Sequence, residues 1–150
     1  MALEDDMAFF ERVPTLAALG RQALRVLAVG ADTRHLANGA VLFYAGEPAD
    51  GGYVVFEGEL LVKPNTADGK EYTVGPGTLL GELALIADTV SPVTAIAKGP
   101  AVVVRISRSL FRKMLEGYPT AASRLREVMA ARLNNWTEEL NSVRTRMDRG

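Results

Sequence analysis

The stretch GELALIADTVSPVTAIA, residues 81–97, decides the fold, because a short helix signal stands here among strand signals. Gly81 and Glu82 open the segment, and ELALIA has the composition of a helix of roughly one or two turns. The first N–H groups of a helix lack partners within it, and with the helix dipole they favour an anion such as phosphate. Gly81 permits close approach of the backbone, and the Glu82 carboxylate can accept two sugar hydroxyls. The stretch itself has no basic side chain to neutralise such a ligand.

Strand signals flank this segment from about residue 33 to residue 107. Apolar and polar residues alternate in AVLFYAG (40–46), GGYVVFEGELLVKP (51–64) and AVVVRIS (101–107). We expect turns at Gly39, Gly46, Gly51, Gly52, Gly58, Gly69, Gly75 and Gly77. Short strands separated by such turns predict a closed antiparallel β-roll, similar to a jelly roll. The predicted core comprises Val54, Val55, Leu60, Val62, Leu83, Leu85, Val103 and Ile106.

Helix signals lie on both sides of the roll. The segment 8–30 contains TLAALGRQALRVLAVG (15–30), which predicts one short amphipathic helix after Pro14 with Thr15 as its cap. After the roll, Ser107 or Ser109 can cap a helix that runs through Leu115, and Pro119 can begin another. The sequence therefore predicts one α+β, mainly β domain over residues 1–150. It combines an N-terminal helix, a roll with a short inserted helix, and C-terminal helices over 108–148.

The last predicted helix carries a heptad pattern. The apolar residues Met129, Leu133, Trp136, Leu140, Val143 and Met147 are spaced by 4, 3, 4, 3 and 4 positions. This is the seam of a two-stranded coiled coil. We expect the first half of the helix to lie on its own roll. A helix of about thirty residues is about 45 Å long, so its second half predicts a homodimer.

The bulk composition excludes several classes of protein. With 17 Lys and Arg against 18 Asp and Glu, the formal charge is −1, so no global field attracts nucleic acid or an anionic membrane. Cysteine is absent, the start MALEDDMAFF is acidic, and no apolar run approaches the ~18 residues of a membrane span. We therefore expect a cytoplasmic protein without a membrane segment.

Taken with GEPADGGYVVFEGELLV (46–62) before it and VTAIAKGPAVVVRISRSLFRKML (93–115) after it, the segment 81–97 resembles a known cassette. It is similar to the phosphate-binding cassette of cyclic nucleotide-binding domains, the modules of catabolite-activator-type regulators, cyclic-nucleotide-dependent kinases and gated channels. The resemblance extends from FFERVPTLAALGRQALRVLA (9–28) into the last helix. It implies a regulatory sensor with cAMP or cGMP as a possible ligand, no other cofactor and no chemistry of its own.

The resemblance also implies roles for individual residues. Gly81, Leu83 and Ala84 would give backbone N–H groups to the cyclic phosphate, and Glu82 would take the ribose 2′-hydroxyl. Thr94 matches the Ser/Thr of the family pattern R-x-A-[ST], whose hydroxyl meets the phosphate or the base. In the register of the family, Trp136 and Thr137 fall where the long helix touches the purine.

Ser91 stands three positions before Thr94, where the family carries the arginine that pairs with the phosphate. A charge-assisted hydrogen bond contributes about 1.5 to 3 kcal/mol, so cyclic nucleotide affinity should fall by roughly 10- to 1,000-fold. Another basic residue could supply the charge, with Lys98, Arg105 and Arg132 as candidates. Arg132 lies on the helix that closes over the pocket in this family, but it could equally pair with Glu82.

Other interpretations remain open at this stage. Glu82 can be an acidic residue favoured in the first turn of a helix, and Thr94 can be a strand residue with a packed methyl group. The whole roll can be a degenerate dimerisation or docking module that binds no nucleotide. It can also be the sensor part of a transcription regulator without its DNA-binding domain, so we expect no DNA binding by this chain alone. An enzyme is disfavoured, because a metal-dependent roll needs several histidines and the sequence has one.

Overall fold

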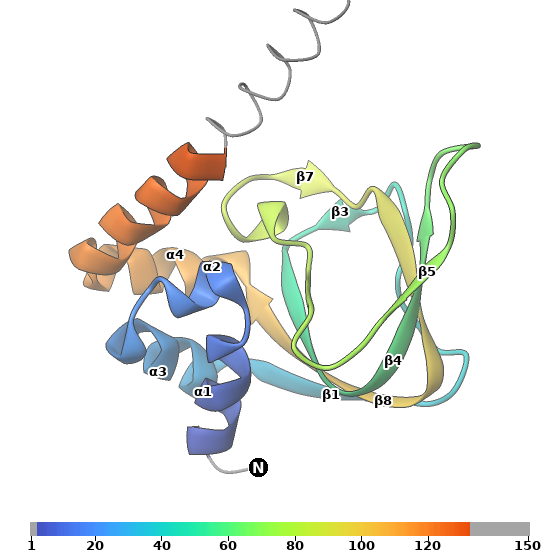
Figure 1. Cartoon of the computed structure of the whole chain (residues 1–150), viewed down its shortest axis with the longest axis horizontal. Helices are drawn as coiled ribbons and strands as arrows, with labels where there is room; N and C mark the ends of the chain where they lie inside the picture. The colour runs from blue at the N-terminus through green and yellow to red at the C-terminus, as the bar shows by residue number, and fades with distance from the viewer. Residues whose placement is uncertain (1–2, 133–150) are drawn as a thin grey trace, which may run out of the picture.

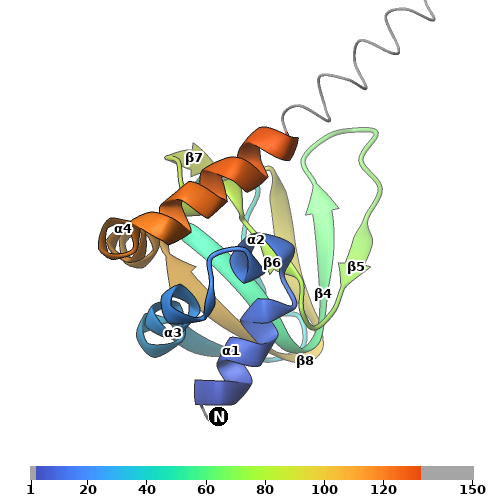
Figure 2. The same cartoon turned by 60° about the vertical axis from the view of Figure 1, so that its left-hand side comes forward.

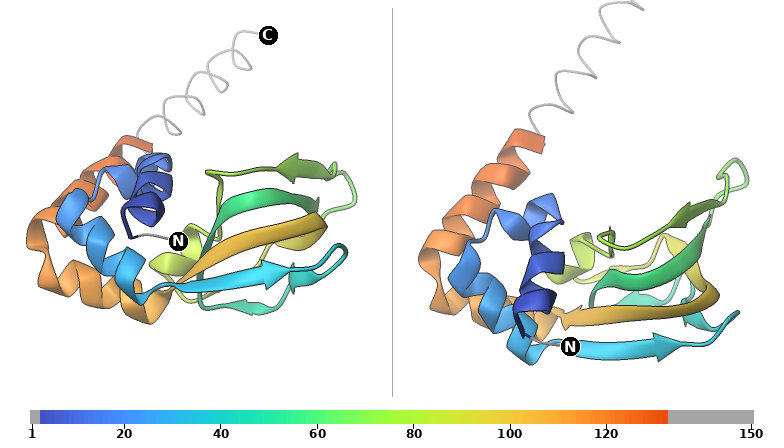
Figure 3. Two further views of the ribbon diagram at one scale, coloured as in Figure 1. Left: turned by 90° about the horizontal axis from the view of Figure 1, so that it is seen from below. Right: turned by 60° about the horizontal axis from the view of Figure 1, so that its bottom comes forward.

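The computed structural model describes residues 3–132 of the chain, and all structural statements concern these residues. An antiparallel roll forms one part of the domain, and the helices gather at one end of it (Figures 1 and 3). The predicted α+β, mainly β architecture is confirmed. Among residues 3–132, none of the helices has the length and apolar character of a membrane-spanning segment.

The roll is built on two long antiparallel strands, β4 (Gly51–Pro64) and β8 (Val93–Ser107). They pair along almost their whole length, from Gly51 opposite Ser107 to Pro64 opposite Val93. Four shorter strands complete this sheet: β1 (Asp32–Leu36) and β2 (Val41–Phe43) on β8, and β5 (Tyr72–Val74) and β6 (Leu79–Leu80) on β4. A separate pair, β3 (Pro48–Ala49) with β7 (Thr89–Val90), lies at the end of the roll nearest the final helix (Figure 1).

Three of the glycines expected in turns lie inside a strand instead. Gly51, Gly52 and Gly58 belong to β4. The register of β4 against β8 shifts between Val55 and Glu59, and Gly58 adopts a φ of 78° there, so this glycine marks a bulge rather than a turn. At Gly51 a Cβ atom would lie 2.3 Å from the Ile106 carbonyl oxygen, so close strand approach is what requires glycine.

The N-terminal helical region comprises three helices, so the prediction of one helix after Thr15 is wrong. They are α1 (Leu3–Glu11), α2 (Pro14–Ala17) and α3 (Arg21–Gly30). Gly20 has a φ of 93°, which interrupts the apolar periodicity and starts α3 in a new direction. Thr15 lies inside α2 and makes no capping bond, so its hydroxyl remains available for other contacts.

The C-terminal helices begin where the sequence predicts. The Ser107 hydroxyl accepts a hydrogen bond of 3.1 Å from the Leu110 N–H and caps α4 (Arg108–Gly117). A final helix starts at 119 and is described as far as 132. Ala121 and Leu125 are buried against the helical core, which confirms that the first part of this helix packs on its own domain (Figure 2). The heptad positions from Leu133 onward lie outside the described residues.

Two apolar cores hold the domain together. One joins the helices to the roll and includes Phe10, Phe56 and Phe111, whereas the other fills the roll around Val55, Leu60 and Val103. Seven of the eight predicted core residues are buried, and Leu83 is the exception, with 58% of its surface exposed. Leu83 opens a short turn whose following residues, Ala84 and Leu85, take the inward positions instead.

Candidate ligand-binding site

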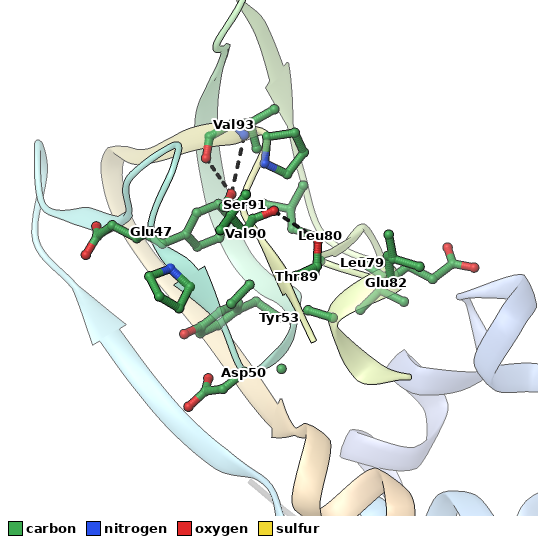
Figure 4. A pocket seen from close by; sticks show the side chains of 18 of the residues that line it. Glu47, Asp50, Tyr53, Leu79, Leu80, Glu82, Thr89, Val90, Ser91 and Val93 are labelled. Atoms are coloured by element: carbon green, nitrogen blue, oxygen red, sulfur yellow. Dashed lines mark hydrogen bonds between the residues drawn. The ribbon is translucent and has the colours of Figure 1, made fainter. Parts of the chain in front are cut away.

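A cavity of about 480 Å³ opens in the roll beside the segment 81–93 (Figure 4). Its volume lies in the range of pockets that hold small molecules and cofactors. Strands β4, β6 and β7, the cassette turn and the loop before β4 all contribute to its wall. The lining residues are Phe43, Glu47, Pro48, Ala49, Asp50, Gly51, Tyr53, Tyr72, Leu79, Leu80, Gly81, Glu82, Leu83, Ala84, Thr89, Val90, Ser91, Pro92 and Val93.

The cassette turn forms as the sequence predicts, in a tighter form. Residues Leu83–Leu85 make a 3-10 helix, η1, with Glu82 as the residue before it. Gly81 has a φ of 79°, and a Cβ there would lie 3.0 Å from the Gly51 carbonyl oxygen, so both conformation and space require glycine. The Ala84 N–H donates a 3.0 Å bond to the Gly81 carbonyl, so the turn itself uses one of the N–H groups proposed for phosphate.

Glu82 is held by two helices that flank the roll. Its Oε1 accepts a 2.8 Å hydrogen bond from the Thr15 hydroxyl of α2 and also accepts from the Arg132 guanidinium of the final helix. Arg132 Nη2 donates a further 2.6 Å bond to the Thr15 hydroxyl oxygen, which closes a three-residue network. In Figure 4 the Glu82 carboxylate points away from the other labelled side chains and toward the helices.

The hydroxyl groups of Ser91 and Thr94 also form hydrogen bonds within the protein. Ser91 is 7% exposed, and its Oγ donates a 2.6 Å hydrogen bond to the Val93 carbonyl oxygen (Figure 4). The same Oγ accepts a 3.3 Å hydrogen bond from the Val93 N–H. Thr94 Oγ1 accepts a 2.8 Å bond from the Ala45 N–H and ties β8 to the loop after β2. Both hydroxyls therefore stabilise the backbone around the cavity.

Arg108 anchors the cassette, and sequence reasoning missed it. Its guanidinium donates to the Ala84 carbonyl at 3.0 Å and to the Ala49 carbonyl at 2.6 Å, and it lies 3.4 Å from an Asp88 oxygen. The side chain is only 17% exposed. Arg108 therefore fastens η1, β3 and the start of α4 together. In the sequence Arg108 is only a basic residue after the capping Ser107, and this local pattern does not predict which carbonyl groups accept its hydrogen bonds.

Asp50 and Arg105 form a second ion pair at the cavity wall. Arg105 Nη2 lies 2.7 Å from Asp50 Oδ1, and Arg105 also approaches Asp32 at 3.7 Å. The hydrogen bond from Arg105 is the main cause that lowers the pKa of Asp50, and the same bond raises the pKa of Arg105. Asp50 therefore remains ionised at neutral pH.

The charged side chains of the cavity wall are acidic. Glu47, Asp50 and Glu82 line it, whereas no Lys, Arg or His among residues 3–132 does so. The three basic candidates differ in placement: Arg132 bonds Glu82, Arg105 bonds Asp50, and Lys98 is exposed on β8 outside the lining. Trp136 and Thr137 lie outside the described part of the chain.

Comparison with known proteins agrees with this architecture. The family model of the cyclic nucleotide-binding domain matches residues 33–118. The chain therefore belongs to the cyclic nucleotide-binding domain family, as its sequence resemblance predicted. Members of this family act as regulatory sensor domains.

Similar proteins include both short and long chains. A cyclic nucleotide-binding-like protein from Brucella abortus is 37% identical with a TM-score of 0.67, covering 75% of this chain and 98% of that one. The N-terminal domain of a transcriptional regulator from Streptomyces coelicolor is 29% identical with a TM-score of 0.80, covering 88% and 94%. An NTE family protein of Mycobacterium tuberculosis is 33% identical over 131 residues, which are 86% of this chain. The matched region spans only 22% of that relative's length.

Proposed function

We propose that this chain is a regulatory sensor module whose cassette binds cAMP and cGMP weakly or not at all. The observation that carries the proposal is the state of Ser91. It lies in the cavity wall, where the family pattern expects an arginine, and its hydroxyl is bonded to the Val93 backbone. A cyclic phosphate would thus meet no charge-assisted bond at this position.

The acidic side chains of the wall add to this weakness. The carboxylates of Glu47, Asp50 and Glu82 repel an anion. Arg105 offsets the charge of Asp50, and Arg132 offsets the charge of Glu82. Each 1.4 kcal/mol changes affinity about tenfold, so loss of one bidentate pair lowers affinity by roughly 10- to 1,000-fold.

The network around Glu82 supports a sensing role for the final helix. A ligand hydroxyl that bonds to Glu82 must share or replace the contacts from Thr15 and Arg132. Because Arg132 belongs to the final helix, occupancy of the cavity would alter how that helix is held. A change in the position of this helix would then be transmitted to any domain or partner chain that contacts it.

Titration calorimetry with cAMP and with cGMP tests the proposal directly. We expect dissociation constants of about 100 µM or weaker for both nucleotides. Titration of cAMP into Glu82→Ala provides the control, because any weak heat of specific binding should vanish in this variant. Low-micromolar binding by the unaltered protein would refute the loss of affinity.

Two further elements belong to this proposal. We infer that the chain pairs as a homodimer through residues 129–147 and resides in the cytoplasm. The matched Streptomyces coelicolor structure is the N-terminal domain of a transcriptional regulator, which favours a sensor that acts on another domain. A degenerate dimerisation or docking module is the second candidate, and the internal bonding of Ser91 and Thr94 favours it.

A further inference from the structure

Four polar side chains at the cavity or beside it, those of Glu82, Thr89, Ser91 and Thr94, form hydrogen bonds within the protein. Glu82 bonds to Thr15 and Arg132, while Ser91 and Thr94 each bond to backbone groups. Thr89 likewise donates to the Val90 carbonyl at 3.3 Å. A ligand would have to break one of these bonds to gain another, so polar recognition adds little net affinity.

The acidic residues of the wall are also committed to other partners. Asp50 pairs with Arg105 at 2.7 Å, and Glu47 accepts a 3.0 Å bond from the Tyr44 N–H. An anion that enters loses its hydration and lies near these carboxylates, and both effects cost free energy. A cation loses its hydration too, while two of the three carboxylates already have a guanidinium partner. Both signs of charge are therefore disfavoured.

The walls that remain are apolar and aromatic. Leu79, Leu80, Val90 and Val93 contribute aliphatic surface, and Val90 is 55% exposed although it is apolar. The rings of Phe43 and Tyr53 lie 5.6 Å apart in a tilted pair beside this surface. Burial of apolar area provides about 25 cal/mol per Å², so such walls favour a ligand with an apolar ring body.

We propose that the cavity binds an uncharged, mainly apolar ring compound in place of a cyclic nucleotide anion. This inference rests on the proposed function, because it assumes that the cavity is the ligand site of a sensor. The inference goes beyond the proposed function because it names the chemical class of the ligand. About 480 Å³ is enough for a fused-ring compound that carries one hydroxyl group.

A series of three compounds with the same ring tests the role of charge. 2-Naphthalenemethanol is neutral, 2-naphthoate is an anion, and 2-naphthylmethylamine is a cation at pH 7. Calorimetry with the full chain should show binding of the alcohol, with both ions at least about tenfold weaker. No binding of the alcohol, or equal or tighter binding of either ion, would overturn the inference.

A pair of variants tests the location of binding. Val90→Trp places a large side chain at the cavity wall on an exposed position and should abolish binding of the alcohol. Val29→Trp is the matched control, because Val29 is 70% exposed on α3 and does not line the cavity. It should bind the alcohol as the unaltered protein does. If both variants lost binding of the alcohol equally, or if neither variant lost it, the ligand would bind elsewhere and the inference would be overturned.

Parallel titrations with cAMP separate this inference from the proposed function. Weak cAMP binding together with no alcohol binding would overturn only the ligand class. Micromolar cAMP binding would overturn the proposed function. If cAMP also bound more tightly than the alcohol, the inference about the ligand class would be overturned as well. Alcohol binding with weak cAMP binding supports both.

Discussion

Arg132 and Glu82 join the final helix to the cassette across 50 positions of the sequence. The Thr15 hydroxyl bonds to both, so α2 is part of the same network. The Arg132 and Glu82 side chains are 47% and 30% exposed, so solvent reaches part of the network. This pair therefore connects the edge of the cavity to the helix that we propose transmits the signal.

A double-mutant cycle measures that connection. Arg132→Gln and Glu82→Gln should each lower the free energy of unfolding by about 1 kcal/mol, with a coupling of about 0.5 to 1 kcal/mol between them. Urea denaturation of the two single variants and the double variant gives these values. Arg126→Gln is the control on the same helix, since within residues 3–132 the Arg126 guanidinium donates to the nearby Ser123 hydroxyl and to no residue of the cavity. Additive effects at positions 82 and 132 would show that the contact is not energetically significant.

Ser91→Arg should raise the affinity for cAMP or cGMP by at least about tenfold, because it adds a charge-assisted pair to the cavity wall. Calorimetry of the variant beside the unaltered protein measures the gain. Ser91→Gln removes the same hydroxyl without adding charge and should gain nothing.

The gain from Ser91→Arg should also disappear in combination with Glu82→Ala, if Glu82 still receives the sugar. An unchanged affinity in Ser91→Arg alone would show that the cassette backbone no longer fits a phosphate. That result would favour the docking-module alternative.

Arg108→Ala should lower the free energy of unfolding by about 2 to 3 kcal/mol. The substitution leaves the Ala84 and Ala49 carbonyl groups without their guanidinium donor in a largely buried place. Thermal or urea denaturation provides the measurement, and Arg112→Ala on the exposed side of α4 serves as a control that should change little. An effect no larger than that of Arg112→Ala would contradict the anchoring role.

Acid should weaken the domain partly through Asp50. The hydrogen bond from Arg105 is the main cause that lowers the folded pKa of Asp50 below its ordinary value of 3.8, so the stabilisation is fully present above that value. The contribution is lost as the pH falls below 3.8 and through the lower folded pKa. Unfolding measured from pH 5 to pH 2 should be less pH-dependent in Asp50→Asn. The difference should be below about 1 kcal/mol, because the Asp50 side chain is 74% exposed. Identical pH profiles would exclude this contribution.

The heptad pattern predicts a dimer at tens of micromolar protein, a concentration at which apolar two-stranded seams commonly associate. Sedimentation of the unaltered chain should give a dimer, and Leu133→Glu combined with Leu140→Glu should give a monomer. A monomeric unaltered chain would contradict the prediction. These positions lie outside the described residues, so the sequence pattern alone supports this expectation.

Local signals in the sequence determined the fold and the position of the cassette. Alternating apolar residues predicted β4 and β8, while Ser107 marked the start of α4 and Pro119 the start of the final helix. Gly81 followed by ELALIA predicted the short turn. Such signals act over a few residues, because caps, turns and strand alternation depend on the backbone and its immediate neighbours.

Only the tertiary structure decided which partners the site residues have. The sequence left Glu82 free to meet a sugar or Arg132, and the fold brings it to Arg132 and to Thr15 from a helix 67 positions away. It equally places Arg108 on two carbonyl oxygens and turns Leu83 outward. These outcomes depend on how separate elements pack against one another. A polar side chain takes whichever partner that packing brings within about 3 Å, and no local pattern encodes that choice.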